Sequence, residues 1–363
     1  MTNPTTCAFI PFDAKNPYQP ALVGALGKLD VRVQGQPWRW LLLSQLRGMD
    51  VIHIHWTSGP ANERLWKFAL GYPLLALQFL WLRMQGRRIV WTVHNLESHE
   101  KRNPIRDHMV SWLLGRMANG VIVHGESAKR AVAQRFGVAP KKITVIPHGN
   151  YIGLYPNDIG REEARRRLKL EAHQRVALFL GNIRPYKGVT ELIEAFRGLQ
   201  ARDAVLVLAG RPLNAEVEQT VARLAGDDGR VLFHPGFVDD SRVQEYMNAA
   251  DVVVFPYREV LTSGAIVLAM SFGKACVAPR LGCIPDVLDS RGGFLYDPDA
   301  PDGLASALRA ALDAGDGSAD MGHRNRETAE AWSWDRIASQ TLDVYRGPAT
   351  DAAHGVQRQA NHV

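Results

Sequence analysis

The stretch VALFLGNIRPYKGVTELIEAF, residues 176–196, decides how this chain is expected to fold. It starts with an apolar run that ends in Gly181, and such a run is typical of a parallel strand buried on both faces. A polar loop follows, and after Gly188 the apolar residues Leu192, Ile193 and Phe196 recur at helical spacing. Strand, loop and helix in this order predict one unit of a doubly wound α/β domain.

The same unit recurs on both sides of this stretch. Further strands are predicted at residues 51–56, 89–94, 120–124, 143–147, 204–210, 231–233, 251–257 and 275–279. Helices are predicted between them at residues 63–85, 106–118, 126–136, 188–200, 214–225, 239–249 and 263–272. The two series predict an α/β fold of two Rossmann-like, doubly wound domains that face a cleft.

The domain boundaries follow from the segments around the two series. Residues 1–150 are predicted to form an N-terminal domain and residues 176–331 a C-terminal domain. A linker over residues 151–175, with glycine, proline and a highly charged helix, joins them. Residues 332–345 are predicted to be a C-terminal helix that crosses back, and the polar tail 346–363 is predicted to be disordered.

Charge is divided unevenly along the chain. Residues 1–150 hold 19 lysines and arginines against 8 acidic residues, whereas residues 151–363 hold 24 against 29. A basic first half predicts an anionic partner, and an anionic membrane surface or a phosphorylated lipid fits it. Nucleic acid is disfavoured because the cations are scattered over predicted helices without interleaved stacking aromatics.

Composition also bears on where the protein works. The three cysteines have neither a disulfide framework nor metal-ligand spacing, which favours a reducing compartment. Residues 1–13 lack the pattern of a signal peptide, and no uncharged apolar run reaches the roughly 18–20 residues that span a bilayer. The expected location is cytoplasmic, at the surface of the inner membrane.

Cationic residues stand where the strand of residues 176–181 ends. Gly181, Arg184 and Lys187 occupy the loop that leads into the next helix. Two cations beside free helix amides favour a site for a diphosphate. The alternative is a solvated loop with two ordinary surface cations.

A second loop, after the strand of residues 251–257, supports the diphosphate interpretation. Thr262, Ser263 and Gly264 stand at the start of a predicted helix. Their amides and hydroxyls, together with the helix dipole, favour phosphate oxygens there. A plain helix cap without a ligand is the alternative, because Ser and Thr are common caps.

These motifs resemble the donor domain of bacterial GT-B glycosyltransferases of the family 4-like group. The resemblance lies in GNIRPYKGVTELIEAF, LTSGAIVLAMSFGKACVAP and WSWDRIA, and it covers residues 7–345. In the first half, VIHIHW, WTVHNLESHE and IPHGNY resemble the subset that acts on exopolysaccharide precursors, such as the xanthan-type GDP-mannose:glycolipid mannosyltransferases. The resemblance implies a GT-B fold, a nucleotide-sugar donor with GDP-mannose as the leading candidate, a lipid-linked oligosaccharide acceptor and no metal cofactor.

The chain departs from the family pattern in the donor loop. The family carries two glutamates eight positions apart, and the second stands directly before an Ala-Met pair. Here Leu268 precedes that pair, and Val260 stands eight positions earlier with Glu259 beside it. The missing glutamate normally contacts the nucleotide ribose, so Glu259 is the remaining candidate, and the nucleotide and the stereochemical outcome stay open.

Histidines collect where the strands of the first half end. His53 alternates with isoleucines on a strand and is interpreted as a core residue. His94 ends the central strand at the expected switch point, where it would hydrogen-bond the donor sugar or a phosphate. No histidine pair has the helical i, i+4 spacing of zinc hydrolases, so no metal site is expected.

Sugar transfer passes through an oxocarbenium-like state in which charge grows on the departing diphosphate. The loop cations are assigned to offset that charge. An inverting reaction also needs a base for the acceptor hydroxyl. Glu100 is the first candidate, His99, Glu97 and Asp13 are the alternatives, and His94 completes the predicted catalytic residues.

Residues 63–88 suit the acceptor side, because an aromatic-rich apolar segment with basic flanks can dock in a bilayer interface. The residues assigned to the acceptor or the membrane are Asn16, Tyr18, Trp66, Trp81, Arg87 and Arg88. The alternative is the buried helix of a Rossmann domain.

Other functions stay open. One is a transferase with a UDP-sugar donor, and another is a noncatalytic module that binds a nucleotide-sugar or a polysaccharide. A sugar-nucleotide epimerase shares the architecture but does not explain the basic, aromatic first half. A dehydrogenase is disfavoured because no G-x-G-x-x-G motif follows an early strand.

Overall fold

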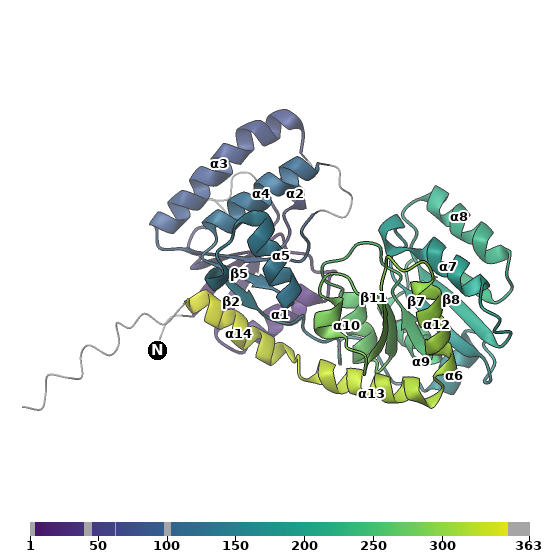
Figure 1. Cartoon of the computed structure of the whole chain (residues 1–363). Helices are drawn as coiled ribbons and strands as arrows, with labels where there is room; N and C mark the ends of the chain where they lie inside the picture. The colour runs from purple at the N-terminus through teal and green to yellow at the C-terminus, as the bar shows by residue number, and fades with distance from the viewer. Residues whose placement is uncertain (1–3, 40–45, 62, 98–102, 348–363) are drawn as a thin grey trace, which may run out of the picture. The chain divides into compact units, whose positions relative to one another are not determined.

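The computed structural model describes residues 4–39, 46–61, 63–97 and 103–347. The chain forms two compact units. Unit 1 comprises residues 1–123, 129–146 and 334–363, and unit 2 comprises residues 124–128 and 147–333. Each unit is built on one six-stranded, fully parallel sheet with helices on both faces, so the predicted α/β fold is confirmed (Figure 1).

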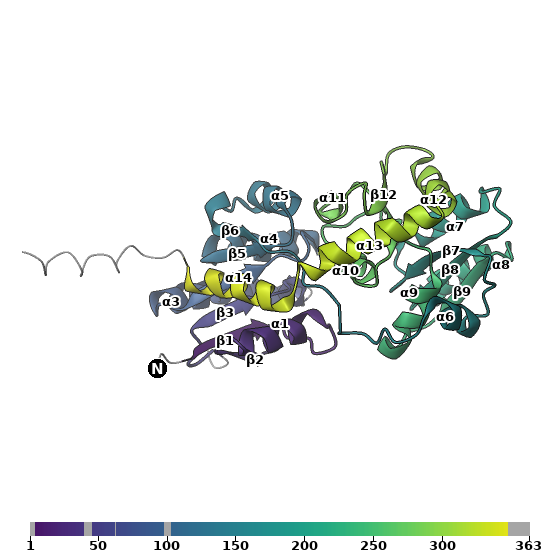
Figure 2. The same cartoon turned by 90° about the horizontal axis from the view of Figure 1, so that it is seen from below.

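The sheet of unit 1 has the strand order β2-β1-β3-β4-β5-β6. Its strands are β1 (Thr5–Ile10), β2 (Val31–Gly35), β3 (Val51–Ile54), β4 (Arg88–Thr92), β5 (Gly120–Val123) and β6 (Ile143–Val145). Its helices are α1 (Tyr18–Gly27), α2 (Ser58–Ala61), α3 (Leu65–Met84), α4 (Pro104–Met117), α5 (Glu126–Phe136) and α14 (Trp334–Arg346). Helices α3 and α4 cover one face of the sheet, and α1 and α14 pack together on the other (Figures 1 and 2).

The sheet of unit 2 has the strand order β12-β11-β10-β7-β8-β9. Its strands are β7 (Arg175–Leu180), β8 (Ala204–Gly210), β9 (Val231–Pro235), β10 (Val252–Val254), β11 (Ala275–Pro279) and β12 (Gly293–Tyr296). Its helices are α6 (Arg161–Arg167), α7 (Val189–Arg197), α8 (Ala215–Gly226), α9 (Val243–Ala249), α10 (Gly264–Ser271), α11 (Ile284–Val287), α12 (Gly303–Asp313) and α13 (Asp316–Glu330). Helix α7 packs on α8 and α12, while α6 packs on α9 and α10 on α13.

Each sheet has one point where the strand order reverses. In unit 2 this switch point lies between β7 and β10, and in unit 1 it lies between β1 and β3. Ligands of open parallel sheets bind outside the carboxyl ends of the strands at such points. The prediction that His94 marks the switch point is therefore wrong, because His94 follows β4, one strand further along the sheet.

Three strands have no predicted range: β1, β2 and β12. Strand β2 is mostly exposed, and β12 is only partly buried. Both are edge strands, which have one strand neighbour and less cover, so they lack the continuous apolar run by which buried parallel strands are recognised. Strand β1 lies between β2 and β3 and its last four residues are buried, so this reason does not apply to it.

The segment predicted as a linker, residues 151–175, instead packs into unit 2. Helix α6 lies against α9, and the buried Arg165 donates hydrogen bonds to the carbonyls of residues 171, 172, 174 and 249. Arg165 also pairs with Asp251 at 2.9 Å, and the same carboxylate pairs with Arg161 at 2.6 Å. A buried guanidinium with this many partners fixes the helix to the domain.

The C-terminal helix α14 belongs to unit 1, although 187 residues of unit 2 precede it in one run. The Tyr345 hydroxyl lies 2.6 Å from Nδ1 of the buried His53, whose Nε2 lies 2.7 Å from the Thr92 hydroxyl. Lys28, which directly follows α1, pairs with Asp335 of α14 at 2.8 Å. The chain therefore closes its first domain with its last described helix, and the predicted tail, from residue 348, lies outside the described residues.

We expect Arg165→Met to destabilise unit 2 by about 3–5 kcal/mol, because it leaves the Asp251 carboxylate and several carbonyls without their buried partner. Arg161→Met removes a more exposed partner of the same carboxylate, and we expect it to cost about 0–1 kcal/mol. Urea unfolding followed by circular dichroism measures both. Equal losses for the two variants would contradict the anchoring role of Arg165.

Candidate functional site

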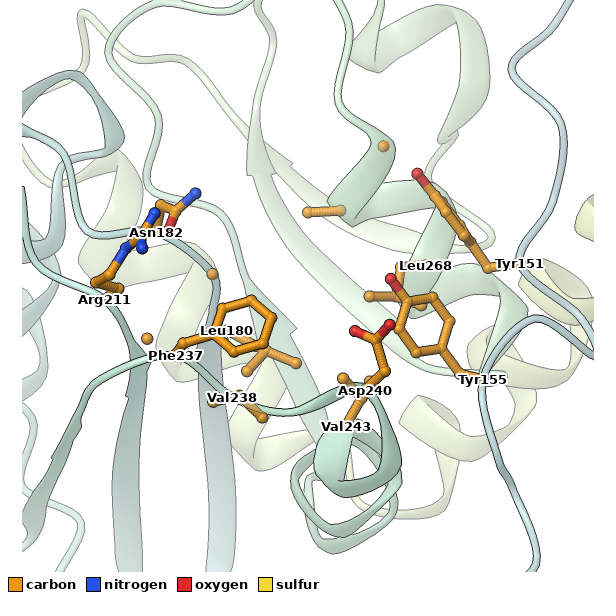
Figure 3. Close-up of a pocket in the computed structure, with 14 residues that line it drawn as sticks. Tyr151, Tyr155, Leu180, Asn182, Arg211, Phe237, Val238, Asp240, Val243 and Leu268 are labelled. Carbon is orange, nitrogen blue, oxygen red and sulfur yellow. The ribbon is translucent and has the colours of Figure 1, made fainter. Parts of the chain in front are cut away.

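A pocket of about 250 Å³ opens at the switch point of unit 2 (Figure 3). It lies at the carboxyl ends of β7 and β8 and beside the start of α10. The lining residues are Tyr151, Tyr155, Leu180, Gly181, Asn182, Gly210, Arg211, Phe237, Val238, Asp240, Val243, Gly264, Ala265 and Leu268. Glycines and apolar side chains form most of the wall, and a few polar groups are placed to orient a ligand.

Lys187 carries a charge at the edge of this pocket. A Cβ built on Gly181 would lie 3.5 Å from its Nζ, which places the ammonium beside the pocket floor. The ammonium lies 5.8 Å from the centre of the Tyr257 ring and has no carboxylate partner among the described residues. Burial, and to a lesser degree the charge of Arg184, lower the pKa of Lys187 to about 8. An anionic ligand at Gly181 would supply the missing counter-charge.

Gly188 holds the loop that carries Lys187 in place. Its φ of 67° lies in the left-handed region that favours glycine, and a Cβ there would come within 1.9 Å of the Pro256 carbonyl oxygen. This close approach brings the β7–α7 loop against the end of β10. The two loops that the sequence analysis selected are thus neighbours because no side chain separates them.

Arg184 is held differently from Lys187. Its guanidinium donates hydrogen bonds to the carbonyls of Ile183 and Arg211, at 3.1 and 3.2 Å. These bonds tie the loop after β7 to the loop after β8. Among the pocket-lining residues the cation is Arg211, to which the sequence analysis assigned no role.

The start of α10 forms another side of the pocket. Ser263 is the N-cap, and its Oγ accepts a hydrogen bond from the Ile266 amide at 3.3 Å. Its hydroxyl therefore caps the helix. Gly264 and Ala265 are the residues of this turn that line the pocket. Thr262 and Glu259 are not among the lining residues.

Four lining residues that the sequence analysis missed give the pocket its character. Tyr151 and Tyr155 come from the segment predicted as a linker, and Phe237 and Asp240 come from the loop after β9 (Figure 3). Burial and the nearby Asp240 charge raise the pKa of Tyr155 to about 12, so its hydroxyl stays protonated. The one signal in the sequence is Phe237, an aromatic residue beside Gly236 at a strand end. Such a pattern is too common to identify a binding site.

The histidines of unit 1 form a stack of rings rather than a metal site. His53 is buried, as predicted for a core residue, and burial lowers its pKa to about 3. Its ring stacks on that of His55, and Nδ1 of His55 lies 3.4 Å from Nε2 of His94. Within the described residues, no group of three His, Cys, Asp or Glu side chains is placed to hold a metal ion. Glu100 and His99 lie outside the described residues.

The residues assigned to the acceptor or the membrane separate in the structure. Trp66 and Trp81 are exposed on α3. Tyr18 is instead buried between His94 and Trp334, and its amide donates a hydrogen bond to the side chain of Asn16, just before α1.

The two arginines of that assignment also have structural partners. Arg87 pairs with Asp50 at 3.2 Å. Arg88 stands at the amino end of β4 and donates a hydrogen bond to the Val344 carbonyl of α14 at 3.2 Å. The Arg88 guanidinium is thus engaged within unit 1.

Comparison with known families identifies both halves of the chain. Residues 14–150 match Glycosyltransferase Family 4, and residues 174–314 match Glycosyl transferases group 1. A D-inositol 3-phosphate glycosyltransferase of Corynebacterium efficiens is 30% identical over 330 residues, which cover 86% of this chain and 74% of that protein. The chain belongs to the GT-B glycosyltransferases.

Other similar proteins use different substrates. The GDP-mannose:glycolipid 4-beta-D-mannosyltransferase of Xanthomonas campestris pv. campestris is 26% identical to this glycosyltransferase over 297 residues, which cover 81% of the chain and 79% of that enzyme. Among solved structures, Anabaena HepE in complex with UDP-glucose has a TM-score of 0.74 at 18% identity and covers 94% of this chain and 99% of its own. The sucrose-phosphate synthase of Thermosynechococcus elongatus has the same TM-score at 20% identity, with 94% and 98% covered.

We expect Gly264→Ala to weaken nucleotide binding by about tenfold, which corresponds to about 1.4 kcal/mol. The new Cβ would lie 2.7 Å from the Tyr151 hydroxyl, so it would displace this side chain within the pocket. The next nearest atom to the new Cβ, Nε2 of His148, is 3.4 Å away, so removal of the Tyr151 hydroxyl relieves the clash. Gly264→Ala with Tyr151→Phe should therefore recover most of the affinity. Calorimetric titration with GDP and UDP measures both variants, and a double variant as weak as the single one would count against this geometry.

Proposed function

We propose that this glycosyltransferase moves mannose from GDP-mannose to a lipid-linked saccharide at a membrane surface, in the synthesis of an exopolysaccharide. The observation that carries the donor assignment is a carboxylate, Asp240, in the pocket of unit 2. Similarity to a GDP-mannose:glycolipid mannosyltransferase supports both substrates. An exposed apolar face on α3 supports the membrane.

The Asp240 carboxylate favours guanine over the other common bases. It makes no hydrogen bond or ion pair with any residue that the structure describes, and it lies among the Tyr155, Phe237 and Val238 side chains that would enclose a base (Figure 3). Guanine presents two neighbouring N–H donors on one edge, which a carboxylate accepts together. Uracil presents a single N–H between two carbonyl oxygens, and those oxygens would be repelled.

The diphosphate of the donor would lie on the glycine floor of the pocket. Lys187 and the amides at the start of α10 face this region, and both favour negative charge. As the bond to the sugar breaks, charge grows on the diphosphate, and donors fixed in advance stabilise it without reorganisation. The same groups therefore serve donor binding and departure of the leaving group.

The base for the acceptor stays a proposal from the sequence. Glu100 is the first candidate, with His99 beside it, and an inverting reaction would use such a group to take the acceptor proton. His94 is described by the structure and is half-buried at the carboxyl end of β4, where it would contact a sugar.

Helix α3 supports the membrane part of the proposal because it is apolar on two faces. One face packs into unit 1 through Phe68, Leu75, Phe79 and Leu82. The other presents a stripe of residues that are 45–69% exposed: Trp66, Leu70, Leu77, Leu80, Trp81 and Met84. An apolar surface of this kind marks an interaction site.

The surroundings of this stripe favour an anionic lipid surface as its partner. The adjacent helix α4 adds the exposed Ile105 and Trp112. Cations stand at the ends of α3 and along α4: Arg64, Lys67, Arg83, Arg106 and Arg116. Apolar and aromatic residues beside lysine and arginine are typical of segments that lie in the bilayer interface.

The same helix has the length and composition of a membrane-spanning helix, contrary to the expectation from the sequence. Of the helices in the described part of the chain, it alone meets these criteria, with 33% of its most apolar window buried in the protein. Because its buried face packs on α4 and β4, we propose that α3 lies on the membrane surface.

We expect GDP to raise the melting temperature of the protein more than UDP or ADP at equal concentration. By mass action, the ligand with the lowest dissociation constant stabilises the native state most. Asp240→Asn should weaken GDP binding by about 10- to 100-fold, because a hydrogen bond to a charged group contributes about 1.5–3 kcal/mol. UDP binding should not weaken. The control is Asp239→Asn, which removes the neighbouring charge while Asn still accepts the Ser241 hydrogen bonds.

The outcomes separate the two donor classes. A shift selective for UDP would keep the transferase and reject GDP-mannose, in line with the UDP-glucose bound by HepE. A GDP-selective shift that Asp240→Asn leaves unchanged would reject the carboxylate as its cause.

We expect the protein to co-sediment with vesicles that contain phosphatidylglycerol, and Leu77→Glu to reduce the bound fraction by at least about tenfold. Transfer of a leucine side chain out of water contributes about 1.5–3 kcal/mol, and the new charge adds a cost. Leu29→Glu is the matched control, since Leu29 is exposed on the same unit but lies outside the α3 stripe. Equal binding by both variants would remove α3 from the membrane contact.

A further inference from the structure

Trp56 stands at the switch point of unit 1, where a parallel sheet binds its ligands. It follows β3 by two residues, and β3 pairs with β1 where the strand order reverses. The His55 amide donates a hydrogen bond to the Ile10 carbonyl at 2.7 Å, so the ends of both strands are joined just before Trp56. The proposed donor pocket lies in unit 2, which leaves this place in unit 1 without an assigned ligand.

A stack of aromatic rings fixes the Trp56 indole. It lies face to face with the His94 imidazole, with the ring centres 4.8 Å apart and the planes 21° apart. The His94 ring stacks in turn with His55, and His55 stacks with the buried His53, which Tyr345 and Thr92 hold by hydrogen bonds. A half-buried indole is thereby supported from the core outward, and a rigid ring binds without losing conformational freedom.

The neighbouring loop is equally fixed. The buried Gln19 side chain donates to the Pro11 carbonyl at 3.0 Å and accepts from the Asp13 amide at 2.7 Å, which holds the loop after β1. A second indole, Trp38, lies beside α2, the helix that follows Trp56, since a Cβ on Gly59 would lie 3.3 Å from its ring. Its Nε1 is buried and has no hydrogen-bond partner among the described residues.

The charges near Trp56 favour a neutral ligand. In the described loops that follow β1, β3 and β4 (residues 11–17, 55–57 and 93–97), Lys15 is the one lysine or arginine, and it is exposed. Within these described residues, a phosphorylated ligand would meet no cluster of cations. Thr57 and Asn95 directly follow Trp56 and His94, and within the described structure their side chains make no hydrogen bond. They are placed to bind hydroxyl groups.

We propose that Trp56 is a stacking platform for a neutral pyranose ring of the acceptor. A pyranose has an apolar C–H face that packs on an indole and a rim of hydroxyls that bind neighbouring polar groups. The inference rests on the proposed function and deepens it: the group recognised in unit 1 is the sugar end of the acceptor, not a phosphate or the lipid. It also separates this chain from enzymes that act on a phosphorylated polyol.

The test is a titration of the full chain with cellobiose, maltose and mannobiose, and with myo-inositol 1-phosphate, followed by saturation-transfer NMR in the presence of GDP. We expect at least one disaccharide to bind, and Trp56→Ala to weaken it by about tenfold, the upper range for an aromatic contact. Trp56→Phe should lose about twofold or less, since it keeps a ring. Leu29→Ala, which removes an exposed apolar residue of the same unit, should change nothing.

Three outcomes would overturn the proposal: no disaccharide binds, the disaccharide binds Trp56→Ala as well as wild type, or the inositol phosphate binds in a Trp56-dependent manner. The thermal shift with GDP and UDP, measured on the same samples, keeps the two proposals apart. A far-UV circular dichroism spectrum and a melting temperature like those of wild type, together with an unchanged nucleotide shift, show that both units of Trp56→Ala are folded, so a lost disaccharide signal then belongs to Trp56. A wild type without any nucleotide shift would reject the proposed donor, while the disaccharide titration still tests Trp56.

Discussion

The parallel pairing of β7 with β10 is the constraint on which the donor site depends. Strands buried on both faces leave no room for polar side chains within the sheet, so polar chemistry moves to the loops at the strand ends. The strand order reverses at the β7–β10 pair, and such a reversal leaves a crevice outside the carboxyl ends of the strands. The Lys187 loop and the start of α10 meet there, although 77 residues separate Lys187 from Gly264.

Two glycines let neighbouring segments approach closely and thereby shape this crevice. Gly188 lets the lysine loop lie against Pro256, and Gly264 leaves room for the Tyr151 hydroxyl. The result is a half-buried ammonium without a carboxylate partner in the described structure. In the function that we propose, a diphosphate would supply the counter-charge, which would link the packing of the loops to the transfer of a sugar.

Unit 1 uses the same sheet architecture for a different task. Its switch point carries aromatic rings supported by a buried histidine, and Tyr345 of α14 secures that histidine. The last described helix therefore stabilises the platform that we assign to the acceptor. On the outer face, α3 is apolar both toward the sheet and toward solvent, which combines a structural role with the lipid contact that we propose. The interpretation of this segment as a buried helix thus holds for one of its faces.

The sequence by itself determined the fold class and the family, and it predicted two strand-end loops of unit 2 that lie next to each other in the structure. Buried parallel strands have continuous apolar runs, and strand-end loops with glycines and cations are local patterns that survive without coordinates. Edge strands β2 and β12 were not visible, because a half-covered strand has no such run. Only the tertiary structure decided that Tyr151, Tyr155 and Asp240 line the pocket of unit 2, that Arg165 anchors the supposed linker, and that Trp56 rather than His94 stands at the switch point. These depend on which strands become neighbours and which loops pack together, and no local spacing of residues encodes such long-range contacts.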